Sequence, residues 1–165
     1  MSRASSNIDP ELLQLLGTVV VKWSYVELFV SDLFVYLSRG APHAMVVVTA
    51  NASQSSLASW IRTLLDLLEC PHDWEKEIRE VLAEIDDMRP ERNAFVHGNW
   101  IAGDGPGAAT IHTIRLERKE VIKTELVTAS DLKAFLDRIQ DQTLRLRAIL
   151  VTCGVWKPEH DANAP

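Results

Sequence analysis

The chain has 165 residues, of which 47% are hydrophobic, which is enough apolar material for one full core but leaves two independent cores small. The sequence therefore predicts a single domain. Its formal charge of -6, from 17 basic and 23 acidic side chains, argues against a protein that coats nucleic acid through an overall positive field, so any RNA contact must be local.

The first predicted element is a long helix from Pro10 to about Leu37. Asp9 stands at the N-cap position and Pro10 at the first helical position, which is a typical helix start. Helical periodicity then continues toward the stop at residues 40–42. Polar side chains occupy only one narrow face, so we expect this helix to be a central element or a contact surface.

The most apolar stretch of this helix, residues 19–37, is interrupted by Lys22, Glu27 and Asp32. These charges argue against a membrane span. No secretory signal precedes them, so we expect a soluble, cytoplasmic protein without a membrane partner. Small residues recur at every seventh position, namely Gly17, Ser24, Ser31 and Ser38. Such a seam permits close approach of a helix, either within the chain or in a homodimer.

Three further helices are predicted in the middle of the chain. Residues 44–49 fit a short helix or a strand, and we expect a helix because no partner strand is visible nearby. Residues 53–68 carry apolar side chains at helical spacing. Asp73 is predicted to cap a third helix that runs to His97 and ends at Gly98.

Two β-branched segments, residues 110–116 and 121–127, bracket a charged turn and predict a β-hairpin. The glycine-rich loop before them, residues 103–107, lacks the Lys-Ser or Lys-Thr of a phosphate-binding loop. A last helix is expected to open at Ser130 and to end at about Cys153.

Together these elements predict an all-α fold, a bundle of about four to five helices with a β-hairpin inserted before the last helix. It would form one domain over residues 9–156, between a disordered N-terminus, residues 1–8, and a disordered tail, residues 157–165. The two cysteines, Cys70 and Cys153, are too few for a disulfide scaffold and too far apart in sequence for a metal knuckle. Reduced thiols are therefore expected.

Arg92 occupies a position at which the apolar pattern predicts a residue such as leucine. The helix ending at His97 carries an apolar stripe, and the same phase puts Arg92 near its centre, flanked by Phe95 and Val96. A guanidinium cannot shed its charge, so it needs acidic or backbone partners, or a cleft open to an anionic ligand. Pro90 is expected to kink the chain unless a new helix starts there.

The segment 91–100 resembles the motif of the HEPN superfamily of ribonucleases and abortive-infection proteins, in which an arginine, a polar residue, three further residues and a histidine follow one another. Here these are Arg92, Asn93 and His97. The long first helix, the motif late in a later helix and the closing helix are also similar to that family. The hairpin and Pro90 depart from it.

The resemblance implies metal-independent cleavage of RNA to a 2′,3′-cyclic phosphate, at a site formed where two protomers of a homodimer meet. It also implies a toxin or phage-defence component, with an antitoxin or another protein as a possible partner. His97 would act as general base or acid at the ribose 2′-hydroxyl and the leaving oxygen. Arg92 would neutralise charge on the phosphorane. Asn93 would orient the phosphate or the catalytic pair.

Each of these residues also has a structural interpretation. Arg92 and Glu27 would form an ion pair, with a direct catalytic role for Glu27 as the lesser alternative, and His97 would cap a helix end. Trp100 would either stack on a base or seal the core. The remaining histidines, His43, His72, His112 and His160, have no carboxylate or cysteine at ligand spacing, so no metal site and no cofactor are expected. The alternative function is a non-catalytic helical module that binds a protein partner through the same dimer seam.

Overall fold

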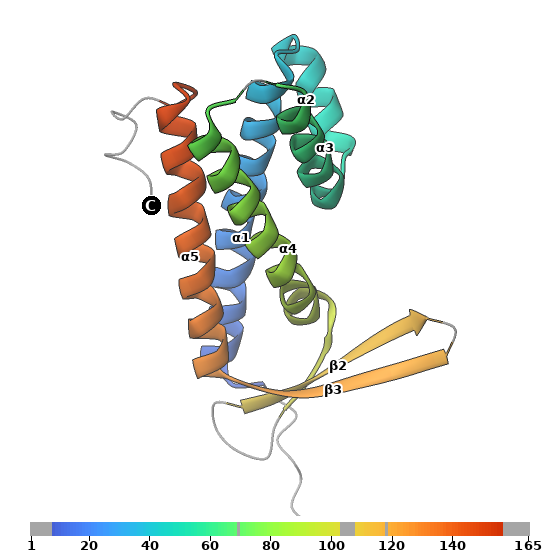
Figure 1. Ribbon diagram of the computed structural model, residues 1–165. Coiled ribbons are helices and arrows are strands. Elements are labelled where there is room, and N and C mark those ends of the chain that lie inside the picture. Colours follow the sequence, from blue (N-terminus) through green and yellow to red (C-terminus); the bar gives the residue numbers. More distant parts are fainter. Residues whose placement is uncertain (1–7, 69, 103–107, 118, 157–165) are drawn as a thin grey trace, which may run out of the picture. The chain divides into compact units, whose positions relative to one another are not determined.

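The computed structural model describes residues 8–68, 70–102, 108–117 and 119–156, and only the backbone of residues 42, 113–117 and 119–123. The expectations for the two termini and for the loop 103–107 lie outside the described residues. The elements in chain order are α1 (Pro10–Ser38), α2 (Pro42–Asn51), α3 (Gln54–Leu67), α4 (His72–His97), β1 (Asn99–Ala102), β2 (Ala108–Glu117), β3 (Lys119–Thr128) and α5 (Ala129–Thr152), as Figure 1 shows.

The described part of the chain is mostly helical, with a small antiparallel sheet before the last helix, as the sequence predicts in outline. The ambiguous segment 44–49 is helical within α2. The predicted hairpin is formed by β2 and β3, which pair from Ala108–Thr128 to Glu117–Lys119. A third strand, β1, was not predicted, and it pairs with β2 in the order β1-β2-β3.

Local hydrogen bonds from side chains cap the N-terminal ends of α1 and α5. Asp9 caps α1 as predicted, because its side chain accepts a hydrogen bond of 2.8 Å from the backbone N–H of Glu11. α5 begins one residue before the predicted Ser130, since Thr128 and Asp131 form a reciprocal cap. The backbone N–H of Asp131 donates to Thr128 Oγ1 at 3.3 Å, and that of Thr128 donates to Asp131 Oδ2 at 2.8 Å.

The chain divides into two compact units. Unit 1 comprises Met1–Trp23 and Met88–Gln140, and unit 2 comprises Ser24–Asp87 and Asp141–Pro165. The helices α1, α4 and α5 each contribute residues to both units. That the chain forms a single domain stays a prediction.

Aromatic side chains form the core of unit 1. Trp23 of α1 is buried and stacks on Phe135 of α5 with ring centroids 6.2 Å apart. Phe95 of α4 meets the edge of the same Phe135 ring at 5.2 Å. The three rings hold the C-terminal end of α4, which carries the HEPN-like motif, against α1 and α5.

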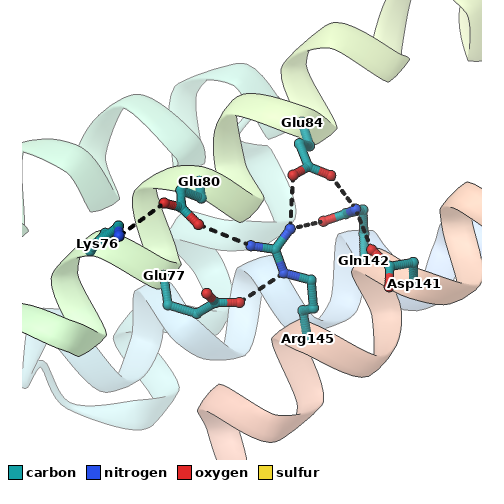
Figure 2. A network of polar contacts seen from close by, with 7 residues as sticks. All are labelled: Lys76, Glu77, Glu80, Glu84, Asp141, Gln142 and Arg145. Atoms are coloured by element: carbon teal, nitrogen blue, oxygen red, sulfur yellow. Dashed lines mark hydrogen bonds and ion pairs between the residues drawn. The ribbon is translucent and has the colours of Figure 1, made fainter.

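In unit 2, an arginine of α5 binds carboxylates of α4, as Figure 2 shows. Arg145 Nε donates to Glu77 at 2.7 Å, its Nη1 donates to Glu84 at 2.9 Å, and its Nη2 lies 3.5 Å from Glu80. The buried Gln142 donates to Glu84 at 2.5 Å. Residue numbers rise on α5 as they fall on α4, so the two helices run antiparallel in this unit.

Among the described residues one helix, α1, is long and apolar enough by length and composition to cross a membrane. The core helix of a soluble protein and a signal sequence pass the same test, and 28% of the apolar window in α1 is buried. The helix has nine buried apolar side chains. They are Leu12, Val19, Trp23, Val26, Phe29, Val30, Leu33, Phe34 and Leu37. The cytoplasmic location, without a membrane partner, stays a prediction.

Candidate functional site

The three motif residues lie together at the C-terminal end of α4. Arg92 is half-buried, whereas Asn93 and His97 are exposed. Arg92 Nη1 donates to Asn93 Oδ1 at 3.1 Å and lies 3.5 Å from His97 Nε2. One guanidinium nitrogen therefore bridges the amide and the imidazole.

On an ideal helix, positions five residues apart differ by about 140°, so Arg92 and His97 do not share a face. They meet because His97 is the last residue of α4 and the arginine side chain is long. The final turn is closed by the backbone N–H of Gly98, which donates to Ala94 O at 2.9 Å. α4 continues through Pro90, so no new helix begins there.

Arg92 lies against an aromatic face that the sequence pattern did not reveal. Its Cζ is 5.8 Å from the centroid of the Trp23 ring. The ring is 1% exposed and rests on Phe135, so it is a fixed platform. A cation over an indole is favourable, which explains how a charged side chain occupies a core-phase position. Trp23 was not singled out in the apolar pattern of the first helix, and only the fold brings it under the guanidinium.

The Arg92–His97 contact involves the imidazole through Nε2. A guanidinium only donates hydrogen bonds, so His97 Nε2 can take part in this one only as the acceptor. At 3.5 Å this hydrogen bond is long, and another hydrogen-bonding group can replace it at little cost. The Nε2 lone pair thus lies at an exposed position beside a cation.

Glu91, the acidic residue next to the motif, is paired with an arginine of α5 in unit 1. Glu91 forms an ion pair of 2.6 Å with Arg138 of α5, and both side chains are partly exposed. Arg138 also lies over the Phe135 ring, at 5.7 Å. A second guanidinium therefore neutralises Glu91, the acidic neighbour of Arg92 in sequence.

Trp100 is half-buried just beyond the end of α4, in β1. Its indole Nε1 donates to the backbone oxygen of Phe95 at 2.8 Å, and its ring lies 6.4 Å from the Phe95 ring. It satisfies one of the carbonyls left open at a helix C-terminus. The indole N–H is thus used to join strand β1 to the helix that carries the motif.

Glu27 belongs to unit 2, where its backbone oxygen accepts a hydrogen bond of 3.0 Å from the Ser31 hydroxyl. Its pairing with Arg92 stays a prediction, as does a catalytic role. In the part of the chain that the structure describes, no three His, Cys, Asp or Glu side chains gather to bind a metal. His112 accepts or donates a hydrogen bond of 3.1 Å with Thr124 across the sheet, and His160 lies outside the described residues.

Comparison with protein-family models, with curated proteins and with solved structures finds no match for this chain. The similarity to the HEPN superfamily therefore rests on the motif and on the order of the helices.

Proposed function

We propose that this protein is a HEPN-type endoribonuclease that cleaves RNA without a metal ion and leaves a 2′,3′-cyclic phosphate. The observation that carries the proposal is the contact of Arg92 Nη1 with both Asn93 Oδ1 and His97 Nε2 at an exposed helix end. A cation can stabilise the phosphorane and an imidazole can act as the general base in the transesterification of RNA, while the amide would hold the cation in place.

In the proposed reaction, His97 Nε2 accepts the proton of a ribose 2′-hydroxyl. The 2′-oxygen attacks the adjacent phosphorus, the bond from phosphorus to the 5′-oxygen breaks, and the leaving oxygen takes a proton from a general acid. Arg92 binds the non-bridging oxygens, whose negative charge grows in the phosphorane. Asn93 orients the guanidinium through its Oδ1. A second copy of the chain in a homodimer brings a second His97, which can serve as the acid.

The Trp23 platform supports this role for Arg92. Because the indole is buried and stacked on Phe135, the guanidinium rests on a rigid surface before RNA binds. A preorganised cation needs little rearrangement as charge develops in the transition state. We infer that Trp23 is a positioning residue, which acts through Arg92.

The test is incubation of the purified protein with labelled RNAs of varied sequence in the presence of a metal chelator. We expect cleavage with cyclic phosphate ends, a loss of about 100-fold or more in His97→Ala and of about 100- to 1000-fold in Arg92→Ala. His72→Ala and Arg39→Ala, at exposed positions outside the motif, are matched controls that should retain activity.

Circular dichroism must show that all four variants are folded. Cleavage that persists in both motif variants, or no cleavage of any RNA, would exclude the ribonuclease proposal. For a toxin or phage-defence component, expression should slow bacterial growth, and His97→Ala should relieve the effect. An antitoxin, or another protein partner, would then be sought by its ability to restore growth.

An exposed part of α1 favours the alternative, a non-catalytic module that binds protein. Leu13, Val20 and Val21 are 52%, 44% and 56% exposed in unit 1. Gly17 lies between them in sequence, and among the described residues no atom other than the backbone of α1 itself and the two chain neighbours would lie within 4 Å of a Cβ added there. Apolar side chains beside an open glycine suit the close approach of another helix. This module would form the same homodimer but would not cleave RNA.

A further inference from the structure

Unit 2 contains two cysteines that are far apart in sequence, one shortly before the start of α4 and one directly after the end of α5. Cys70 lies in the connection between α3, which ends at Leu67, and α4, which begins at His72. Cys153 directly follows α5, and its backbone N–H still donates to Ile149 O at 2.8 Å. Both thiols are free and half-buried.

The antiparallel contact of α4 with α5 brings these two places to the same end of the unit. Arg145 is bonded to Glu77 at 2.7 Å, which fixes the helices side by side (Figure 2). Cys153 lies eight residues after Arg145, or about 12 Å along α5 at 1.5 Å per residue. Cys70 lies seven residues before Glu77, which is about the same advance in the same direction.

The face of α5 that carries Cys153 is the one that meets α4. Cys153 follows Gln142 by eleven residues. On a regular helix this spacing is three full turns plus about 20°, so the two side chains lie on nearly the same face of α5. Gln142 is buried and donates to Glu84 of α4, and Leu146 between them is also buried. The Cys153 side chain is therefore directed toward the α4 side of the helix.

The chain after Cys153 is held in place within unit 2. Gly154 has a φ of +73°, which lets the backbone turn away from the helix axis. Trp156 then donates from Nε1 to Asp32 Oδ2 at 3.1 Å, and its ring meets that of Phe29 at 4.7 Å. Burial raises the pKa of the Cys153 thiol, and the charge of Cys70, at the same end of the unit, raises it further.

We propose that Cys70 and Cys153 are a redox-active pair that forms a reversible intramolecular disulfide, with a small-molecule disulfide as the oxidant. The cross-link joins the α3–α4 connection to the end of α5. It is independent of the ribonuclease proposal, because it concerns unit 2 alone.

The reaction proceeds by two exchanges. The Cys70 thiolate attacks one sulfur of the small disulfide, so that a mixed disulfide forms and one small thiol leaves. The Cys153 thiolate then attacks the Cys70 sulfur and releases the second small thiol. Two electrons pass from the protein thiols to the small disulfide, and their two protons end on the released thiols. We expect Cys70 to react first, because the raised pKa of the Cys153 thiol lowers the fraction of Cys153 that is present as thiolate.

The test uses the full chain treated with oxidised glutathione, then with a thiol alkylating agent, and analysed by intact mass. We expect a monomer that has lost two hydrogens and takes up no alkylating agent, a Cys70–Cys153 linked peptide after digestion, and complete reversal by dithiothreitol. The oxidised chain should also melt about 5–10 °C higher than the reduced chain.

Cys70→Ser and Cys153→Ser are the matched controls, and each should give only a mixed disulfide or an unmodified thiol, with no rise in melting temperature. Glutathione on both cysteines of the unsubstituted chain, a disulfide between chains, or two thiols that stay open to alkylation would each overturn the proposal.

Discussion

Arg92 shows how a single charged residue can depart from an apolar pattern without breaking the fold. A guanidinium over a buried aromatic ring gains roughly 0.5–2 kcal/mol. A charge-assisted hydrogen bond contributes about 1.5–3 kcal/mol. The Trp23 contact therefore orients the guanidinium without using its N–H groups. A phosphate oxygen would compete with Asn93 and His97 for Nη1, and its charge-assisted hydrogen bond would favour the exchange.

Trp100 is the residue whose contribution to the motif can be measured separately from catalysis. Replacing it by phenylalanine keeps an aromatic ring but removes the donor to Phe95 O. The carbonyl lies at a helix end close to the core, so we expect Trp100→Phe to lower the free energy of unfolding by about 1 kcal/mol. Urea titration followed by circular dichroism measures this loss.

Trp60→Phe, at an indole 42% exposed on α3, is the matched control and should change stability by less than about 0.5 kcal/mol. An equal effect of the two substitutions would show that ring size, and not the hydrogen bond, determines the loss.

Among the helices and strands, the sequence predicted those that have a local pattern of their own. Helical periodicity located four of the five helices, and β-branched runs located β2 and β3, whereas a helix was expected at α2 only because no partner strand was visible nearby. β1 was missed because it has only four residues, which is too short for a strand pattern to be recognised. These residues form a strand through their pairing with β2, and the local sequence does not reveal that pairing. In the same way, the motif predicted Arg92, Asn93 and His97, but the contribution of Trp23 depends on packing between α1 and α4.

The start of α5 gives a prediction about pH. Asp131 accepts hydrogen bonds from the side chain and the backbone N–H of Thr128, which lower its pKa below the usual value of 3.8. A lowered pKa contributes stability that is present above the unfolded value and is lost as the pH falls through the folded value. Asp131→Asn should therefore destabilise the protein at about pH 6, by roughly 0.5 kcal/mol because solvent screens this exposed carboxylate, and much less at about pH 2.

Urea titrations of Asp131→Asn and of the unsubstituted chain at the two pH values measure this difference. Asp137→Asn, at an exposed position later in α5, is the control and should show no comparable pH dependence. A destabilisation by Asp131→Asn that is the same at both pH values would mean that the carboxylate charge does not strengthen the cap.

For the whole molecule, a formal charge of -6 bears on how the proposed ribonuclease would bind RNA. Because a negatively charged chain is not attracted to RNA at long range, the affinity would depend on a few local phosphate contacts, and binding should depend less on salt than in strongly basic proteins. A composite site in the proposed homodimer would meet this condition, because two copies of Arg92 would act on one RNA. Association of two chains is thus the step on which the proposed activity depends.

That association can be tested on the exposed face of α1. Val20→Asp places a charge beside the open position of Gly17, and a charge buried between two helices without a partner is strongly unfavourable. We expect the unsubstituted chain to sediment as a dimer and Val20→Asp as a folded monomer, with RNA cleavage reduced at least about 100-fold because one His97 then lacks its counterpart. Val46→Asp, at a valine 62% exposed on α2, should keep both dimer and activity. A Val20→Asp monomer that cleaves RNA at the full rate would show that each chain carries a complete site, and His97 would then need its general acid from within its own chain.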